Sequence, residues 1–482
     1  MEIERLINLK NKKVLVFGDY MVDKYVFGKV NRISPEAPVP VIEVESEQLK
    51  LGGSGNVINN LISLGTNVRV LGCIGYDTPG EFIMNSFIND KIDTNYFKQY
   101  SEIKTIQKTR IVSKKQQFMR IDEEIIEELP NDYYIYIKKN INEILSDIDS
   151  IIISDYAKGA VNQKFAQLVI QNAKLLNIPI IIDPKGNNYE KYKGATLCTP
   201  NMKELQEVTK TKISSEEDIF KYGKNLVQHL DLENLIVTRS EDGMSLITHN
   251  TKKDFPAIAK EVIDVSGAGD TVVATIAVLK ALDFDIDEIC ILANLAASVV
   301  VSKFGTSTLS LDELVSTIEE NPNFKFLELS TVKYIINELK LKNKKIVFTN
   351  GCFDLLHVGH IHSFEQAKKM GDILIVAVNS DSSVKENKSD LRPIIPQEDR
   401  IKMLCSLDLV DYVILMEDKT PENIISLIQP DICVKGSDWK GKDIPEKKTI
   451  DSYGGQLRFV DLEKGKSTTN IINKVIKVYE KK

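Results

Sequence analysis

Short runs of apolar residues alternate with amphipathic stretches along most of the chain. These runs are rich in Ile and Val and apolar on both faces, which is typical of parallel strands covered by helices on both sides of a sheet. In the first part of the chain they lie at 13–19, 67–75, 150–156, 178–184 and 234–240. Helical periodicity separates several of them, as at 56–65 and 163–177. This alternation predicts a doubly wound α/β sheet.

Two segments of the first part depart from this pattern. Residues 39–50 and 105–122 read as strands with polar residues on both faces. A strand that is polar on both faces does not fit inside a sheet that helices cover. We therefore predict that these segments form a small antiparallel sheet, set apart from the main one, which acts as a lid over a site.

A polar stretch that becomes rich in lysine divides the chain near its two-thirds point. A new apolar strand follows at 345–351, and further apolar runs lie at 372–380, 410–416 and 431–436. The second part therefore repeats the alternation of strands and helices, and its size is normal for one domain. We predict a first domain at 1–315, a helical linker at 316–343 and a Rossmann-like domain at 344–482.

Composition narrows the classes of protein to which the chain can belong. Of the 482 residues, 43% are hydrophobic and 27% are charged, which is typical of a globular protein. The net charge of −7 excludes a general positive field that would attract nucleic acid. Six dispersed cysteines favour free thiols in a reducing compartment over disulfides or zinc. Neither a signal peptide nor a membrane-spanning run is evident. We predict a cytoplasmic protein with no nucleic-acid partner, no membrane partner and no structural metal.

A glycine-rich turn before an apolar helical run at 264–282 is the first candidate site. Small residues at Gly267, Ala268 and Gly269 let the backbone approach a ligand, and N–H groups at a helix start can hold phosphate oxygens. Asp270 follows in the first helical turn and could accept a proton from an attacking hydroxyl. The same residues also fit an ordinary helix start.

A cluster of histidines marks the second candidate site. His357 and His360 are three residues apart and share a face if they are helical, whereas His362 points elsewhere. A zinc site needs further ligands, and the sequence supplies no obvious cluster. A strand at 345–351 leads into a glycine-containing turn and a helix, which favours phosphate binding by the helix N-terminus and the histidines.

The glycine-rich turn and five other segments, in their order along the chain, resemble the ribokinase family of sugar, sugar-phosphate and nucleoside kinases. The other segments are GDYMVDKY (18–25), GGSGNV (52–57), TPNMKE (199–204), VTRSEDG (237–243) and AASVVVSKFGTST (296–308). The resemblance implies that Asp270 is the catalytic base, that Gly267, Ala268 and Gly269 form an anion hole, and that ATP with Mg²⁺ is the donor. It implies sugar contacts by Asp19, Asp23, Gly52, Gly53 and Asn56. It implies ATP contacts by Asn201, Met202, Lys203, Glu204, Arg239 and Gly243.

The second site, TNGCFDLLHVGH (349–360), resembles the HxGH motif of the nucleotidyltransferase superfamily in its cytidylyltransferase-like form. The resemblance extends to 377–400, 434–439 and 465–472. It implies that His357 and His360 are catalytic and that Arg400 orients the helix that follows it. It implies nucleotide and phosphate contacts by Thr349, Asn350, Gly351, Phe353, Lys385, Lys388, Arg392, Gly436, Ser467 and Thr468.

Nearly the whole chain resembles the family of bifunctional heptose enzymes of bacterial lipopolysaccharide synthesis. The matching phrases include PEAPVPV (35–41), SDYAKGA (154–160) and EDKTPENII (417–425). The resemblance implies phosphorylation of D-glycero-β-D-manno-heptose 7-phosphate at its anomeric hydroxyl, and transfer of AMP from ATP to the heptose 1-phosphate, which yields ADP-heptose and pyrophosphate.

Basic residues of the predicted lid, at Lys108, Arg110 and Arg120, are candidates for binding the phosphate of the substrate, although exposed basic residues on strands are usually only solvated. We expect a homodimer through the first domain, because exposed sheet edges invite pairing. Two alternatives stay open at this point. One is a kinase and nucleotidyltransferase for another sugar or a polyol phosphate, with CTP as a possible donor. The other is a non-catalytic nucleotide sensor.

Overall fold

The structure is a computed structural model that describes residues 3–113, 116–258, 262–303, 307–320, 325–327, 343–389 and 391–461, with a few single positions between 332 and 341 and at 472 and 478. The chain divides into two compact units, and the boundary in the sequence lies between Thr317 and Ile318. We call Ile3–Thr317 the first unit and the residues from Ile318 onward the second unit. Each unit is described by itself.

A nine-stranded sheet with the strand order β13-β12-β11-β10-β9-β8-β1-β4-β5 forms the centre of the first unit. Its strands are β1 (Lys13–Gly18), β4 (Asn67–Gly75), β5 (Phe97–Tyr100), β8 (Ser150–Ser154), β9 (Ile180–Asp183), β10 (Leu197–Cys198), β11 (Asn234–Thr238), β12 (Met244–Ile247) and β13 (Lys252–Phe255). The strands from β5 to β11 are parallel, and β12 and β13 add an antiparallel edge. The predicted α/β class is confirmed, and the antiparallel edge was not predicted.

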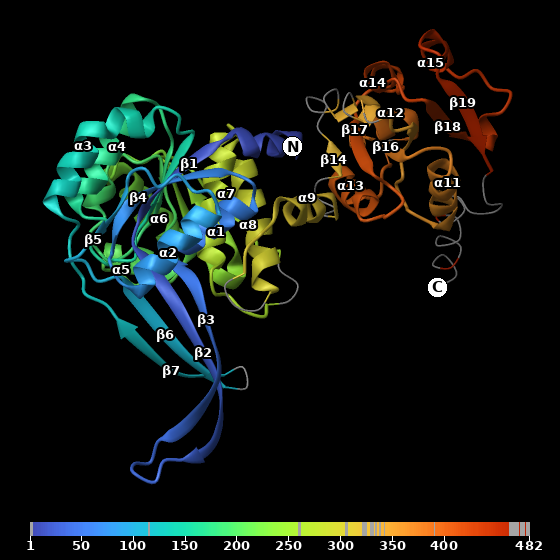
Figure 1. Ribbon diagram of the computed structural model, residues 1–482. Helices are drawn as coiled ribbons and strands as arrows, with labels where there is room; N and C mark the ends of the chain where they lie inside the picture. Colours follow the sequence, from blue (N-terminus) through green and yellow to red (C-terminus); the bar gives the residue numbers. More distant parts are fainter. Residues whose placement is uncertain are drawn as a thin grey trace. The chain divides into compact units, whose positions relative to one another are not determined.

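Helices cover both faces of this sheet (Figure 1). The helices are α1 (Ser54–Ser63), α2 (Thr78–Asn89), α3 (Asn131–Leu145), α4 (Gln163–Leu175), α5 (Met202–Thr209), α6 (Glu216–His229), α7 (Ala268–Ala281), α8 (Ile286–Val301) and α9 (Leu311–Glu320), with short 3-10 turns at Ile3–Asn11, Glu190–Tyr192 and Ser240–Asp242. On one face, α3, α4 and α6 bury a core around Phe17 and Phe165. Helix α7 packs against α1, α8 and the sheet, so nearly all of its side chains are buried.

A second, four-stranded sheet projects from the α/β body of the first unit (Figure 1). Its strands, in the order β3-β2-β6-β7, are β2 (Tyr20–Ile33), β3 (Pro40–Gly53), β6 (Ile106–Ser113) and β7 (Gln116–Glu123). The predicted lid segments are strands of this sheet, but the prediction missed β2 and the parallel pairing of β2 with β6. The sequence of β2 runs directly on from β1, and that continuity hid the change of sheet.

Cross-strand pairing sorts the lid side chains onto two faces, because directly paired residues point to the same side of a sheet. Asp23 pairs with Lys108, and Lys108 pairs with Asp122. Arg110, two residues after Lys108, shares this face and pairs with Arg120. We call this side the Asp23 face. The opposite face carries the alternate residues Val22, Lys24, Thr109, Ile111, Met119 and Ile121.

A six-stranded parallel sheet with the order β14-β17-β16-β15-β18-β19 forms the second unit. Its strands are β14 (Phe326–Leu327), β15 (Ile346–Gly351), β16 (Ile373–Asn379), β17 (Tyr412–Met416), β18 (Ile432–Gly436) and β19 (Gln456–Val460). Its helices include α11 (Val358–Lys368), α12 (Asp381–Asn387), α13 (Gln397–Cys405), α14 (Glu422–Ile428) and α15 (Lys447–Ser452), with a 3-10 turn at Ser437–Trp439. In neither unit does the described chain contain a helix long and apolar enough to cross a membrane.

The segment predicted as a helical linker, 316–343, is partly core of the second unit. Strand β14 pairs with β17 in the six-stranded sheet. Leu327, Val332 and Ile336 are buried in the same apolar cluster as Phe348 of β15. Part of the predicted linker therefore belongs to the second unit. The prediction missed this because the segment is polar on average, and its three core residues are widely spaced in the sequence.

Candidate active sites

Asp270 is a buried carboxylate in the first turn of α7, with 8% of its surface exposed. The hydroxyl of Tyr156 donates a hydrogen bond to its Oδ1 at 2.6 Å, and Nδ2 of Asn56 donates to its Oδ2 at 3.0 Å. Burial raises the pKa of Asp270 to about 6, and the two hydrogen bonds act against that rise. A carboxylate with such a pKa is mostly ionised at neutral pH and can still take up a proton, which suits a general base.

The turn before Asp270 presents backbone N–H groups at the start of α7. Gly267 caps the helix with a φ of 83°, in the left-handed region that glycine adopts without a steric penalty. Ala268 follows as the first helical residue, and a Cβ built at Gly269 would meet no described atom within 4 Å. The first N–H groups of a helix have no partner within it, so this open space can receive an anion.

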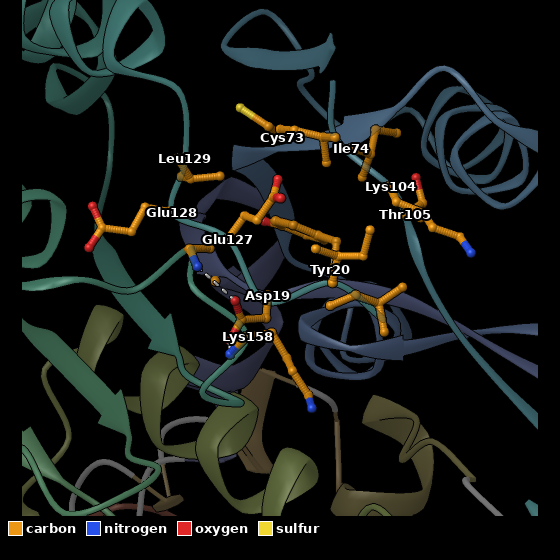
Figure 2. A pocket seen from close by; sticks show the side chains of 15 residues that line it. Asp19, Tyr20, Cys73, Ile74, Lys104, Thr105, Glu127, Glu128, Leu129 and Lys158 are labelled. Carbon is orange, nitrogen blue, oxygen red and sulfur yellow. Dashed lines mark hydrogen bonds between the residues drawn. The ribbon is translucent and has the colours of Figure 1, made fainter. Parts of the chain in front are cut away.

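Asp19 binds the backbone of the loop that follows β8. Its Oδ2 accepts N–H bonds from Tyr156 at 2.8 Å and Lys158 at 3.1 Å, and its Oδ1 accepts one from Ala160 at 3.0 Å. Figure 2 shows Asp19 and Lys158 among the residues that line a small pocket here. Burial, and then the charge of Asp155, raise the pKa of Asp19. The structure therefore places Asp19 beneath the loop, with its oxygens engaged there, although the sequence predicted a sugar contact.

Asp23 and the glycines of β3 lie beside Asp270. Oδ1 of Asp23 accepts a hydrogen bond from Nη2 of Arg110 at 2.8 Å. A Cβ at Gly52 would lie 2.7 Å from Oδ2 of Asp23, so this position has no room for a side chain. Gly53, with a φ of 56°, caps α1 and so positions Asn56 in the first turn. The negative charge of Asp23 contributes to the raised pKa of Asp270, so the two carboxylates are near enough for their charges to interact.

Two of the residues predicted to contact ATP form a reciprocal cap at the start of α5. The N–H of Glu204 donates to Oδ1 of Asn201 at 3.0 Å, and the N–H of Asn201 donates to Oε2 of Glu204 at 2.9 Å. Nζ of Lys185 donates to the other oxygen of Glu204 at 2.7 Å. Met202 is half-buried, and the largely exposed Lys203 pairs with Glu207 along the helix. The capping role explains the conformation of Asn201 and Glu204 without a ligand.

Arg239 and Gly243, also predicted to contact ATP, stabilise the turn between β11 and β12. The side chain of Arg239 is 8% exposed and forms ion pairs with Glu216 and Asp254. Gly243 has a φ of 84°, and a Cβ there would lie 2.1 Å from the carbonyl oxygen of Phe255. The structure thus accounts for both residues by local packing.

The histidine pair of the second unit lies at the start of α11. His357 is the N-cap, and its N–H donates to Nδ1 of His360 at 3.4 Å. The two rings stack with their centroids 3.9 Å apart. Burial, and then the charge of His357, lower the pKa of His360 to about 4. A neutral His360 whose Nδ1 accepts a bond carries its proton on Nε2, which is then a donor for a phosphate oxygen. His362 pairs with Glu365 outside this arrangement.

The turn that precedes the histidines begins at the end of β15. Oγ1 of Thr349 donates to the carbonyl of Val434 on β18 at 3.1 Å. Gly351 has no room for a side chain larger than hydrogen without displacement of Phe353, whose ring would lie 3.0 Å from a Cβ. Phe353 has a φ of 47°, which is rare outside glycine and typical of functional turns, and its ring edge contacts His360. These contacts fix the predicted phosphate turn beside the histidines.

Lys435 joins this site, although the sequence analysis did not single it out. Its Nζ donates to Oδ1 of Asn350 at 2.8 Å and forms an ion pair with the buried Glu446. It also lies 5.3 Å from the ring centre of Trp439. Gly436, predicted to contact the nucleotide, ends the same strand. Lys435 lies in the recognised segment 434–439, but the resemblance assigned a contact only to Gly436, and nothing in the sequence marked the lysine as its neighbour.

The arginines near the histidines position the loops of the site. Arg392 pairs with Asp354, a buried residue that also accepts the N–H groups of Ile394 and Ile395 at 2.7 and 3.0 Å. The fully buried Arg400 donates to the carbonyls of Cys352 and Asn379 and to Asp381, each at 2.6–2.7 Å. Arg400 thereby joins the turn to the end of β16 and the start of α12, and it lies within α13 rather than before the helix that it was predicted to orient.

The remaining predicted phosphate ligands differ in how far the structure places them. Lys385 and Lys388 are exposed at the end of α12. The positive charge of Lys388 acts against the burial that raises the pKa of Cys352 in the turn of the site. Ser467 and Thr468 lie outside the described residues.

Comparison with known protein families finds a match for each unit. Residues 11–314 match the pfkB family of carbohydrate kinases, and residues 348–473 match the cytidylyltransferase-like family. The bifunctional protein HldE of a Nitratiruptor species is 41% identical over 467 residues, which are 96% of this chain and 99% of that protein. The bifunctional protein HldE of Haemophilus influenzae (strain PittEE) is 43% identical over 469 residues, which are 97% of each chain.

Solved structures resemble the first unit. Ribokinase of Arabidopsis thaliana, complexed with ribose and ATP, has a TM-score of 0.53 at 18% identity and covers 64% of this chain and 99% of its own. Phosphofructokinase-2 of Escherichia coli has a TM-score of 0.53 at 17% identity and covers 64% of this chain and 97% of its own. At such identity these likenesses show the fold alone.

Proposed function

The chain belongs to the family of bifunctional HldE proteins, as a pfkB-family carbohydrate kinase joined to a cytidylyltransferase-like part, and on this basis we propose which residues carry its two reactions. The protein is a bifunctional enzyme of ADP-heptose synthesis, with a kinase activity and an adenylyltransferase activity. The first unit converts D-glycero-β-D-manno-heptose 7-phosphate into the 1,7-bisphosphate. The second unit joins the heptose 1-phosphate to AMP from ATP and releases pyrophosphate.

Asp270 is the general base of the kinase reaction in this proposal, and its geometry is the observation that carries it. The anomeric hydroxyl gives its proton to Asp270 while its oxygen bonds to the γ-phosphorus of ATP, and the bond from that phosphorus to the β-phosphate oxygen breaks. The N–H groups of Gly267, Ala268 and Gly269 lie at the positive end of α7, where they stabilise the transferring phosphate. Asn56 and Asp23 are then placed to contact the sugar.

The Asp23 face of the lid supplies a site for the 7-phosphate of the sugar. Lys108 is the cross-strand partner of Asp23, and Arg110 forms an ion pair with Asp23. Arg120 extends the same face on β7. Burial, and then the nearby positive charge of Lys158, lower the pKa of Lys108, and the charges of Asp23, Asp122 and Glu124 act against this. A phosphate dianion would complete this arrangement.

The adenylyltransferase reaction needs no general base. A phosphate oxygen of heptose 1-phosphate is already anionic, so it bonds to the α-phosphorus of ATP as the bond to the pyrophosphate oxygen breaks. Nε2–H of His360, together with His357, donates to the phosphates at the start of α11. Lys388 and Lys435 approach the same turn from α12 and β18 and neutralise the charge of the phosphates. Lys385, Ser467 and Thr468 complete the proposed set.

Enzymes of both families generally need Mg²⁺ when they use ATP. Among the described residues no group of three His, Cys, Asp or Glu side chains is arranged to hold a metal ion. Glu204 is the acidic residue proposed near the phosphates, but Asn201 and Lys185 already occupy its two oxygens. This donor set fits an ion that the ATP phosphates hold and that contacts the protein through water. The Mg²⁺ would neutralise phosphate charge in both reactions.

A homodimer through the lid is the proposed assembly. On the opposite face of the lid, Met119 and Ile121 are 58% and 45% exposed. An exposed apolar sheet face of this kind is typical of an interface, and a second copy would bring an identical lid.

All six cysteines are free thiols, which supports a location in the reducing cytoplasm. We further propose domains at 1–315 and 344–482, with the intervening residues assigned mainly to the second.

Product analysis tests the proposed function. The purified protein is incubated with Mg-ATP and either heptose 7-phosphate or heptose 1-phosphate, and products are identified by mass spectrometry. The proposal predicts a bisphosphate from the first mixture, and ADP-heptose with pyrophosphate from the second. Because residues 348–473 match a cytidylyltransferase-like family, CTP is tested in parallel. Turnover with CTP alone, or only with another sugar or polyol phosphate, would retain the two chemistries and remove the heptose or ATP assignment.

A further inference from the structure

Tyr156 contacts the proposed catalytic carboxylate of the first unit directly. Its hydroxyl donates to Oδ1 of Asp270 at 2.6 Å, which is within the range of strong hydrogen bonds between a hydroxyl and a carboxylate. Burial, and then the negative charges of Asp270 and Asp183, raise the pKa of Tyr156 well above 10. The phenol therefore stays protonated and acts as a donor throughout the pH range in which the enzyme works.

The loop that carries Tyr156 is anchored by two buried aspartates. Asp19 accepts the N–H groups of residues 156, 158 and 160, as described above. Oδ1 of Asp155 accepts the N–H of Ala157 at 2.6 Å, and its Oδ2 accepts the hydroxyl of Tyr192 at 2.6 Å. Lys191 also pairs with Asp155. The two aspartates accept hydrogen bonds from the backbone N–H groups of residues 156, 157, 158 and 160, so the loop is a rigid support for the tyrosine ring.

Asn56 holds the other oxygen of Asp270 from the opposite side. Its carbonyl accepts Nδ2 of Asn60 at 3.0 Å, and Oδ1 of Asn60 accepts Oγ1 of Thr271 at 2.9 Å. Helices α1 and α7 are thereby joined next to Asp270. The carboxylate receives one donor on each oxygen, and each oxygen keeps a lone pair for a further donor.

We propose that Tyr156 is a positioning residue of the kinase reaction, whose hydroxyl orients the Asp270 carboxylate toward the acceptor hydroxyl and keeps it ionised at neutral pH. The inference rests on the proposed function of Asp270. Asp19 acts through Tyr156, because it holds the loop and not the sugar. No proton moves to or from Tyr156 in the reaction; the proton of the acceptor hydroxyl goes to Asp270.

The groups that face Asp270 determine the direction of the effect. They are Tyr156 after β8, Asn56 on α1, Asp23 on β2 and Asp183 at the end of β9. Burial and the charge of Asp23 favour the protonated form of Asp270, whereas the two hydrogen bonds favour the ionised form. Removal of the tyrosine hydroxyl therefore raises the pKa of Asp270, and a base that must be ionised then works only at higher pH.

The test compares Tyr156→Phe with the wild-type full-length protein. The pH profile of kinase kcat/KM should move its acid limb upward by about one unit, which is about a fivefold loss at pH 6 that recovers above pH 8. The γ-carbon of Asp270 is followed in parallel by NMR with ¹³C-labelled aspartate and assigned with Asp270→Asn. It should titrate about one unit higher in Tyr156→Phe. Tyr133→Phe is the control, since Tyr133 is a buried tyrosine of the same unit whose hydroxyl bonds to backbone at Gly72 and Tyr96 and not to Asp270.

A second variant keeps the inference testable if the Tyr156→Phe protein does not fold. Incorporation of 3-fluorotyrosine at 156 keeps the shape of the side chain and makes the phenol a stronger donor, so Asp270 should titrate at lower pH. Equal Asp270 titration in all these proteins, or a uniform loss of kinase rate with an unmoved acid limb, would overturn the inference. A wild-type protein without turnover of heptose 7-phosphate would remove the proposed function, while the NMR titration still decides the inference.

Discussion

Asn56 and Asp270 are 214 residues apart in the sequence, yet Nδ2 of Asn56 donates a hydrogen bond to Oδ2 of Asp270 at 3.0 Å. The contact exists because Gly53 allows β3 to turn sharply into α1, and because α1 packs against α7. A segment after the lid and the start of a late helix thus meet at one buried carboxylate. The proposed kinase site of the first unit is built around this pair.

Asn56→Asp should inactivate the kinase at neutral pH. The change places a second carboxyl about 3 Å from Asp270, and two carboxyls this close do not both ionise. Asp270 would then be protonated over the normal working range, and we expect the kinase rate at pH 7 to fall at least tenfold. Initial rates with heptose 7-phosphate measure the effect. Adenylyl transfer by the same preparation is the control, and an unchanged kinase rate would contradict the assignment.

Asp270→Asn should stabilise the first unit at neutral pH. The folded-state pKa of Asp270 is raised from 3.8 to about 6, so the ionised side chain lowers stability as the pH rises through about 6. This difference corresponds to about 3 kcal/mol at pH 8, it falls to about 1 kcal/mol near pH 4.5, and it disappears only below 3.8, the lower of the two pKa values. Thermal unfolding of wild type and variant at pH 4.5 and pH 8 measures it. An equal gain at both pH values would point to a cause other than ionisation.

Lys108→Gln should weaken binding of the phosphosugar and leave ATP binding unchanged. The loss of one cation from the Asp23 face is expected to raise the KM for heptose 7-phosphate about tenfold, with less effect on kcat. Lys24→Gln is the matched control, because Lys24 is on the same strand pair but on the opposite face, where it pairs with Glu47. Equal effects of the two substitutions would refute a phosphate site on the Asp23 face.

Lys435→Met should impair the second unit in two separable ways. It leaves the carboxylate of Glu446, which is 2% exposed, without its positive partner, at a cost of about 3–5 kcal/mol in stability. It also removes a cation from the turn at Asn350, which is proposed to bind phosphate. The double variant Lys435→Met with Glu446→Gln should regain most of the stability but little adenylyltransferase activity. Recovery of both would show that Lys435 has only a structural role.

The main strands of both sheets could be predicted because buried parallel strands are continuous apolar runs. Strand β4 lies at Asn67–Gly75, as predicted, and β15 begins one residue after the predicted start. Strand β2 was missed, since the chain passes from the main sheet to the lid sheet between Gly18 and Tyr20, and no pattern of polarity marks that change. The two-residue strand β14 is too short to have a pattern.

The sequence identified many of the candidate residues, but it did not show which groups they contact. The resemblance pointed to Asp19, Arg239 and Arg392, but it did not give their contacts. The structure shows that Asp19 binds the loop after β8, that Arg239 pairs with Glu216, and that Arg392 pairs with Asp354. Conversely, Tyr156 and Lys435 have roles that depend on contacts with Asp270 and Asn350, at distant positions in the sequence. Long-range contacts between isolated side chains have no periodic signal, and a single sequence does not reveal them.

The central claim is that two separate sites carry out the two reactions. Asp270→Asn and His360→Ala are each assayed, with products identified by mass spectrometry, for conversion of heptose 7-phosphate to the bisphosphate and of heptose 1-phosphate to ADP-heptose. We predict that Asp270→Asn loses kinase activity by about 10²–10⁴-fold and keeps adenylyl transfer, and that His360→Ala does the reverse. If either variant, while still folded, lost both activities, or if neither lost one, the two-site account would be contradicted.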